Sequence, residues 1–301
     1  MNKKNLLAYA AVTTAMILWA LSFIWYKEAF ENKFSPISVI FLRLTIAVIL
    51  FLIVTSIIFK RQKVARKHYK LFFILAFFEP FLYFMAEAHG LKYVSATVAS
   101  VIIALIPLLT PFAAYLFLKQ KLKPSHLIGL IISFVGVGMV VFAGSSDVSA
   151  NSLGISLMFV AAISVLGYSI TLVKLLENYN TVTIMLYQNI IAWFLFLPFF
   201  LLFDIETVKN IPFTFESYYP ILKLGVFASV VAFTLFVFSL NHISITIANM
   251  FTYLIPALTA LFAFVILDEN IYLQSVIGIF VVICGLIIPH IYTSIQKKRS
   301  S

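Results

Sequence analysis

The chain has 301 residues, of which 63% are hydrophobic and only 11% are charged. This excludes an ordinary water-soluble domain, in which about half of the residues are apolar and about a quarter are charged. The formal net charge is +10, but the basic residues gather in short segments between apolar runs, so the charge indicates no nucleic-acid site.

The chain contains ten apolar runs of membrane-spanning length. A helix needs about 20 apolar residues to cross roughly 30 Å of hydrocarbon. The runs cover residues 6–26, 36–59, 71–90, 95–118, 124–143, 153–173, 182–203, 217–240, 245–267 and 271–292. The connections between them are too short to fold as a separate domain. The sequence therefore predicts an all-α integral membrane protein with ten transmembrane helices.

The first run follows Met1, Asn2, Lys3 and Lys4, a start that is also compatible with a secretory signal peptide. The length of the run and its lack of a clear small-residue cleavage site favour a retained first span. The single cysteine, Cys284, lies within a span. It forms neither an internal disulfide nor a metal cluster, and we expect no metal site.

The basic residues lie mainly on one side of the predicted spans. Alternate assignment of the loops places fifteen Lys and Arg on the side of the N-terminus and four on the other, with Arg43 and Lys223 inside spans. Such a bias predicts that both termini are cytoplasmic. The basic segment 60–70 then lies beside anionic membrane lipid.

The two halves of the chain repeat one another. Residues 91–136 align with 240–285 at a constant shift of 149, without a gap, and fourteen positions are identical, among them Pro107 and Pro256. We expect only about four identities by chance in so apolar a composition. The sequence therefore contains two copies of one membrane unit.

Five spans in each copy force the second copy to enter the membrane from the opposite face. We therefore expect two inverted five-helix repeats, residues 1–143 and 144–301, related by a pseudo-two-fold axis in the membrane plane. Inverted repeats with interrupted spans are typical of secondary transporters, whose substrate binds near the midplane between the copies.

Small residues and prolines recur at matched places. Gly129 and Gly136 are seven residues apart, as are their counterparts Gly278 and Gly285, so each pair shares one helix face and allows close packing. Pro107 and Pro256 are expected near the middle of their spans, where a proline kinks a helix and frees a carbonyl. We interpret the two prolines as hinges.

Charged groups inside spans are expensive and mark functional sites. Glu79, Tyr83 and Glu87 follow one another at steps of four residues, so they form one stripe on a helix. The positions 149 residues later are apolar: Ala228, Ala232 and Phe236. The stripe is therefore no requirement of the repeated fold, and this asymmetry indicates a substrate or proton site.

Two interpretations of the acidic stripe remain open. In the first, Glu79 or Glu87 binds a substrate ammonium group or takes up a proton, since a carboxyl in a low-dielectric cavity protonates more easily than in water. In the second, Glu79 stays protonated and caps backbone freed around Pro80, while Glu87 reaches water. Arg43 either pairs with a Glu or holds a substrate carboxylate, and Lys223 is expected to reach the aqueous surface.

Further polar residues are candidates for the lining of a cavity between the helices, although each is also compatible with an interhelical hydrogen bond. They are Trp19, Ser22, Tyr168, Ser169, Gln188, Asn189, Asn249, Thr252 and Tyr253.

Several segments resemble the drug/metabolite transporter superfamily, in particular its EamA-type ten-span branch. Trp19 with the small residues around it in 17–23 is similar to the first-span motif, and Ser35-Pro36 followed by Arg43 to the start of the second span. Residues 91–96 and 107–110 resemble the signature of the third and fourth spans. The resemblance covers nearly the whole chain.

One departure concerns the Gly-Glu pair that the family usually carries after its fourth and ninth spans. The chain has Lys119-Gln120 and Asp268-Glu269 there. The resemblance implies a multi-pass carrier of the plasma (bacterial inner) membrane, and such carriers mostly export or exchange small metabolites such as amino acids and their derivatives. It implies that spans 1–4 and 6–9 surround the pathway, without a soluble cofactor.

The partners predicted are a small-molecule substrate, membrane lipid and protons, and the assembly is a monomer or a homodimer. A lipid-carrier flippase and a passive facilitator on the same fold are the alternatives. A membrane enzyme is disfavoured, because no metalloprotease helix motif and no nucleophile with a plausible base is visible.

Overall fold

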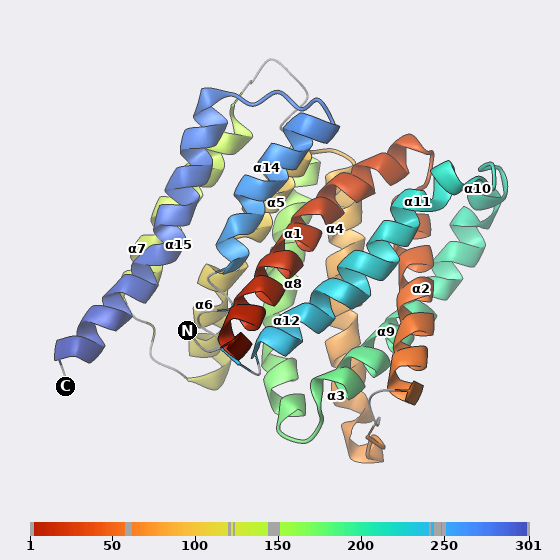
Figure 1. Ribbon diagram of the computed structural model, residues 1–301, viewed down its shortest axis with the longest axis horizontal. Coiled ribbons are helices and arrows are strands. Elements are labelled where there is room, and N and C mark those ends of the chain that lie inside the picture. The colour runs from red at the N-terminus through yellow and green to blue at the C-terminus, as the bar shows by residue number, and fades with distance from the viewer. Residues whose placement is uncertain are drawn as a thin grey trace.

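A computed structural model of the protein describes residues 3–57, 62–119, 122, 124–143, 151–240, 242–243, 248 and 251–299. Every regular element in these residues is a helix (Figure 1). In chain order they are α1 (Lys3–Glu31), α2 (Pro36–Ile57), η1 (Arg66–His68), α3 (Tyr69–Ala76), η2 (Phe77–Leu82), α4 (Tyr83–Leu91), α5 (Ala96–Ile103), α6 (Ile106–Leu118), α7 (Pro124–Val141), α8 (Ser152–Leu176), α9 (Thr181–Phe199), η3 (Phe200–Asp204), α10 (Ile205–Lys209), α11 (Phe215–Lys223), η4 (Leu224–Val231), α12 (Ala232–Leu240), η5 (Thr252–Leu254), α14 (Ile255–Ile266) and α15 (Leu273–Arg299).

The helices match the predicted apolar runs. Within the described residues, seven helices are long and apolar enough to cross a membrane. Three shorter apolar helices cover Ala96–Phe112, Thr252–Ile266 and Leu273–Pro289. Each of these ten segments overlaps one predicted run. The prediction of an all-helical protein rich in membrane spans is confirmed for the described part of the chain.

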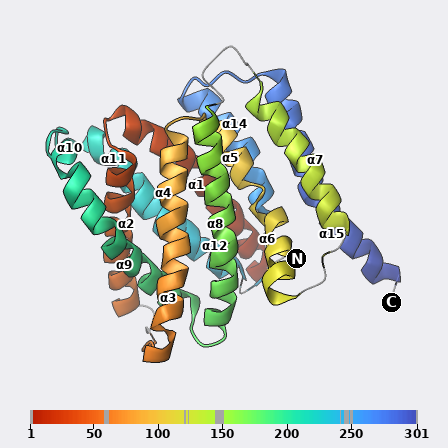
Figure 2. The same cartoon turned by 180° about the vertical axis from the view of Figure 1, so that it is seen from behind.

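The helices form a bundle with two ends, which we name by the residues found there. The Lys33 end holds the connections near residues 31–36, 92–95, 204–214 and 267–272. The Arg66 end holds η1 and the connection 176–181. In Figure 1 the Lys33 end points up, and both α1 and α15 reach their chain termini in the lower half of the view. Figure 2 shows the same arrangement from behind.

Helix packing repeats itself between the two halves of the chain. Helix α1 packs on α11, η4 and α12, and α8, which occupies the corresponding place in the second half, packs on α3, η2 and α4. Corresponding helices also pack on one another: α2 on α9, α5 on α14 and α7 on α15. These contacts of one half therefore have counterparts in the other.

The α7–α15 pair shows why the repeated glycines are needed. A Cβ atom on Gly136 would lie 2.6 Å from the Gly278 carbonyl oxygen, and one on Gly285 would lie 2.6 Å from that of Gly129. Early residues of α7 thus meet late residues of α15, so the two helices run antiparallel. Only glycine allows backbones to approach this closely.

The prolines lie differently from the prediction. The fourth apolar run is broken at residues 104–105 between α5 and α6, and Pro107 is the second residue of α6. Pro256 is likewise the second residue of α14, directly after η5. A proline in the first turn of a helix leaves no hydrogen bond unmade. The expected mid-helix kink is therefore wrong, and a break before each proline takes its place.

The third and eighth spans share an irregularity. Both pass through a wide π-helical segment, η2 in the first half and η4 in the second. In η2 the backbone at Glu79 is not helical at all, with φ −148° and ψ 123°, and Pro80 follows. Such segments free backbone groups inside the bundle and turn side chains away from the regular helical positions.

Candidate functional site

The centre of the bundle contains a cavity of about 230 Å³. It is smaller than the roughly 300–1,000 Å³ pockets that hold drug-sized ligands. Its walls come from α1, α2, the third span, the break before Pro107, α8, α12 and the break before Pro256. The polar residues that line it are Trp19, Ser22, Arg43, Glu79, Tyr83, Glu87 and Thr252.

Glu79 is one of two carboxylates on the wall of this cavity. The interruption of the third span at Glu79 places its side chain on the cavity wall. Within the described part of the chain, the Glu79 carboxylate makes no hydrogen bond or ion pair, unlike Glu87. A carboxylate inside a membrane bundle without a protein partner is poised to receive a proton or a cationic ligand. The expectation that Glu79 caps backbone around Pro80 has no matching contact.

Glu87 is held in place by its neighbour in the stripe. The Tyr83 hydroxyl donates a hydrogen bond of 2.7 Å to Glu87 Oε1. The Glu87 side chain is buried, with 5% of its surface exposed, so it does not reach bulk water as one interpretation expected. Glu79, Tyr83 and Glu87 all line the cavity, although the non-helical backbone at Glu79 interrupts the regular helix on which the spacing of four relied.

Arg43 enters the cavity wall from α2 and is also buried. Its Nε donates to Ser229 Oγ at 2.7 Å, and its Nη1 donates to the Tyr26 hydroxyl at 2.9 Å. The guanidinium carbon lies 4.2 Å from the centre of the Phe84 ring. Among the described residues Arg43 forms no ion pair with a Glu. Three of its five N–H donors remain after these two bonds and are available to a ligand.

Trp19 and Ser22 form the α1 side of the cavity. The indole Nε1 of Trp19 donates to the Ala228 carbonyl at 3.2 Å, in the irregular segment η4. The Trp19 ring meets Phe233 edge to face with ring centres 5.0 Å apart. The Ser22 hydroxyl donates to the Trp19 carbonyl at 2.6 Å. This side is therefore aromatic, with its polar atoms already paired.

Gln188 and Asn189 lie beside the cavity rather than in it. Together with Glu79 and Ser229 they line a second, much smaller void of about 10 Å³. Asn189 Nδ2 donates to the Met185 carbonyl at 2.7 Å. Glu79 lines both spaces, so the small void touches the cavity at this carboxylate.

The remaining predicted residues do not add to the lining of the cavity described here, and two residues that hold Arg43 were missed. Tyr253 is buried in the core beside it, and Asn249 lies outside the described residues. Tyr26 and Ser229, which hold Arg43, were not predicted. Both contact Arg43, which lies on a different helix, so no spacing within their own segments could have indicated the contact.

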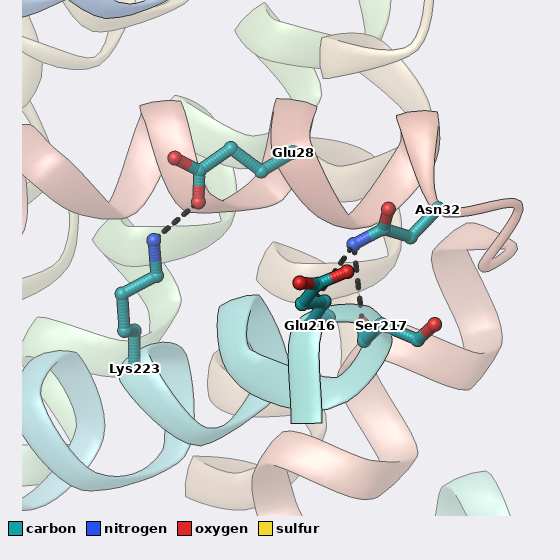
Figure 3. Close-up of polar contacts among 5 residues, drawn as sticks. All are labelled: Glu28, Asn32, Glu216, Ser217 and Lys223. Carbon is teal, nitrogen blue, oxygen red and sulfur yellow. Dashed lines mark hydrogen bonds and ion pairs between the residues drawn. The ribbon is translucent and has the colours of Figure 1, made fainter. Parts of the chain in front are cut away.

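The Lys33 end is closed by contacts between the two halves. Lys223 on α11 forms an ion pair with Glu28 on α1, and Asn32 Nδ2 donates to the Ser217 carbonyl at 3.2 Å (Figure 3). Lys223 also faces the Tyr219 ring at 4.7 Å. Lys223 therefore pairs inside the bundle surface instead of extending into water as predicted.

A second set of contacts at this end involves Glu269, after the ninth span. Its carboxylate accepts a hydrogen bond of 2.8 Å from the Ala96 amide and one of 3.0 Å from the Thr97 hydroxyl. These groups begin α5, where a carboxylate is stabilised by unpaired amides and the helix dipole. Lys27 Nζ donates to the Val94 carbonyl at 2.6 Å nearby.

A model of the EamA-like transporter family matches the chain twice, over residues 6–142 and again over 152–289. The chain belongs to this family. An uncharacterized transporter of Archaeoglobus fulgidus is 26% identical over 290 residues, covering 96% of this chain and 99% of its own. The uncharacterized transporter YetK of Bacillus subtilis is 24% identical over 300 residues, covering 99% and 89%.

The fold has a counterpart among solved structures. A crystal structure matches 98% of this EamA-like chain and 99% of its own chain, with a TM-score of 0.67 and 16% sequence identity. At this identity the match speaks for the fold alone. Together with the apolar helices, family membership makes the protein a multi-pass membrane protein and a transporter, and it speaks against an enzyme.

The family's Gly-Glu pair has a structural reason in this EamA-like chain. Lys119 and Asp268, which stand at the glycine position of the two copies, both have positive φ, 54° and 51°. This left-handed conformation at a helix end favours glycine, which has no Cβ. The position after Asp268 keeps the Glu, and that Glu269 caps α5.

Proposed function

We propose that the protein is a secondary transporter that exports a small metabolite through the central cavity by alternating access, in exchange for protons. The single observation that carries this proposal is the half-buried Glu79 carboxylate, which faces the cavity without a partner among the described residues. In a bundle interior such a group is expensive to keep unless a ligand or a proton uses it.

The proposal includes ten spans arranged as two inverted repeats, residues 1–143 and 144–301. The exchange of contacts between corresponding helices supports a two-fold relation between the halves. A further contact supports it: Ser133 Oγ donates to the Val282 carbonyl at 3.1 Å, and these residues are 149 positions apart. Residues related by the shift meet where a two-fold axis passes.

Alternating access requires that the two ends of the pathway open in turn. The ion pair Lys223–Glu28 and the cap of Glu269 on α5 join the halves at the Lys33 end, so we assign them to a gate that is closed in this structure. The breaks before Pro107 and Pro256 border the cavity and are the proposed hinges, since a broken span bends at low cost.

The cavity favours a small ligand with a cationic group. Glu79 offers a free carboxylate, and the unused Arg43 donors lie on another wall of the same cavity for an acidic group. Phe84 and Phe233 add apolar surface. An amine, an amino acid or an amino-acid derivative has this combination of groups.

A thermal-shift screen of the purified protein against amines, amino acids and nucleosides tests the proposal. A ligand that binds the folded state raises the melting temperature in a concentration-dependent way. We expect a cationic or zwitterionic compound to do so for the wild type and not for Glu79→Gln. Stabilisation of both proteins to the same extent would remove Glu79 from the binding site.

The orientation is tested separately. We propose a plasma-membrane protein with both termini in the cytoplasm, because the basic residues gather on that side. Reporter fusions at residues 1 and 301 should both read cytoplasmic, and a fusion after residue 33 should read external. Termini on opposite sides would contradict the inverted repeat.

A further inference from the structure

One buried polar atom beside the cavity lacks a partner. Gln188 is 4% exposed, and its Oε1 is among the buried side-chain atoms of the described residues without a hydrogen bond. A buried acceptor left unpaired costs about 1–3 kcal/mol. Native structures normally satisfy such an atom with protein or with an ordered water.

The small void next to this atom has the size and the lining of a water site. Its volume is about 10 Å³, and a cavity of roughly 10–15 Å³ holds one water if two to four polar groups surround it. Glu79, Gln188, Asn189 and Ser229 provide those groups. A water molecule has two hydrogens to donate, and the Gln188 Oε1 and the Glu79 carboxylate are two acceptors without other partners.

The void lies on one particular side of Glu79. Phe51 and Met185 form part of its wall, six residues before the end of α2 and four residues after the start of α9. Both of those helix termini are at the Arg66 end. The cavity residue Glu87, in contrast, is eight residues further along the third span towards the Lys33 end. Glu79, Phe84 and Phe233 line both spaces, and Glu79 is the charged residue between the void and the cavity.

We propose that one water binds between Gln188 and Glu79 and carries protons between Glu79 and the Arg66 end. The transfer is concerted: the water gives one hydrogen to a Glu79 carboxylate oxygen as it accepts a proton from the side of the Arg66 end, so the void holds a neutral water before and after the step. Gln188 is then a positioning residue, because it holds the water and does not itself accept the proton. The relay rests on the proposed function, whereas the water site does not.

The surroundings of Glu79 are consistent with a neutral occupant of the void. The charged groups that act on Glu79 are Arg43 from α2 and Glu87 from α4. Tyr83 on α4 and Tyr168 on α8 are the neutral titratable groups that its charge reaches. Arg43 donates to Ser229, which lines the void. A cation in the void would sit next to this guanidinium, so a water is favoured over a sodium ion.

Radiolytic hydroxyl labelling of the purified full-length protein tests the water site without any transport assay. Met185 lines the void and is only 8% exposed. A bound water beside it produces radicals locally, so we expect Met185 to be labelled several-fold more than Met158, which is 0% exposed and lines neither the cavity nor the void. Equal, low labelling of the two methionines in the wild type would overturn the proposal.

Two variants assign the water to Gln188. Gln188→Leu removes the acceptor that holds the water and should lower Met185 labelling to the level of Met158, while Gln188→Glu keeps an acceptor and should retain the labelling. Unchanged labelling in a folded Gln188→Leu protein would contradict the assignment. A higher melting temperature in sodium chloride than in choline chloride would assign a cation to the void instead and would also overturn the proposal.

The relay is tested in liposomes once a substrate is known. Gln188→Leu should slow substrate-driven proton flux several-fold, and Gln188→Glu should restore most of it. If Met185 is labelled as expected but the flux is unchanged, the water site stands and the relay fails. If no variant or wild-type protein moves protons, the proposed function fails and the labelling result is unaffected.

Discussion

The third and eighth spans are the same structural unit with different chemistry. Both contain a π-helical segment at matched positions, and each packs on the first span of the opposite half. The third span carries Glu79 and Glu87 at the cavity, whereas the matching positions in the eighth span, Ala228 and Phe236, are apolar. The repeat therefore determines how these helices are arranged, and residues that differ between its copies line the candidate site.

The side chains that lie next to these two irregular segments also differ between the halves. Trp19 on α1 donates to the Ala228 carbonyl, so the freed backbone of η4 is satisfied by protein. The position 149 residues after Trp19 is Tyr168, which lies within reach of the Glu79 charge and interacts with Gln188. In η4 a backbone carbonyl accepts a hydrogen bond from the Trp19 indole. In η2 the Glu79 carboxylate instead borders the small void.

The largest effect is expected from removal of the group that only the third span has. Glu79→Gln keeps the shape of the side chain but can no longer exchange a proton or pair with a cation. Substrate-driven proton flux in liposomes should fall to the level of protein-free vesicles. Glu206→Gln is the control, because Glu206 is 75% exposed and pairs only with Lys209. Proton flux at the wild-type rate in the Glu79→Gln variant would show that Glu79 has no role in transport.

Positions that the two copies share should instead respond alike. Gly136→Ala and Gly285→Ala each bring a Cβ to 2.6 Å from a facing carbonyl oxygen, and we expect each to lower the stability by about 1–3 kcal/mol. Thermal unfolding in detergent measures the loss. Gly138→Ala is the matched control on α7, since nothing lies within 4 Å of its Cβ position. A large difference between the two variants would contradict the symmetric contact.

A smaller effect is expected where the copies differ by one charge. Glu269 caps α5 with a carboxylate, and its counterpart Gln120 is neutral. Glu269→Gln should lower the melting temperature by an amount that corresponds to roughly 1 kcal/mol, because the helix dipole favours a negative group. It should also increase the reactivity of a cysteine placed at Thr252, by opening the Lys33 end. An unchanged reactivity would argue against a gate at Glu269.

The smallest effect concerns the left-handed residues at the ends of α6 and α14. Asp268 has φ 51°, a conformation that costs an L-residue about 1–2 kcal/mol and glycine much less. Asp268→Gly should therefore raise the unfolding temperature slightly, and Lys119→Gly should do the same. Glycine at Lys33, which has φ 70° outside the repeat pattern, provides a comparison. Destabilisation by Asp268→Gly would indicate a contact of its carboxylate.

Much of the frame follows from the sequence because it depends on local patterns. Apolar runs of sufficient length predict the helices, and the constant shift of 149 predicts which helices correspond. The spacing of four in Glu79, Tyr83 and Glu87 places them on one wall. The prolines show the limit of such patterns: they mark the irregular places correctly, but whether a span kinks or breaks depends on the helices packed around it.

The tertiary structure alone decided which polar groups are paired and which are free. The spacing of residues in the sequence does not show that Arg43 donates hydrogen bonds to Ser229 and Tyr26. It also does not show that Lys223 pairs with Glu28, or that Gln188 and Glu79 line one void. These contacts join residues far apart in the chain, and their strength depends on burial and on distances that sequence does not contain. The sequence by itself determined the membrane helices and their duplication, because both are properties of composition and order along the chain.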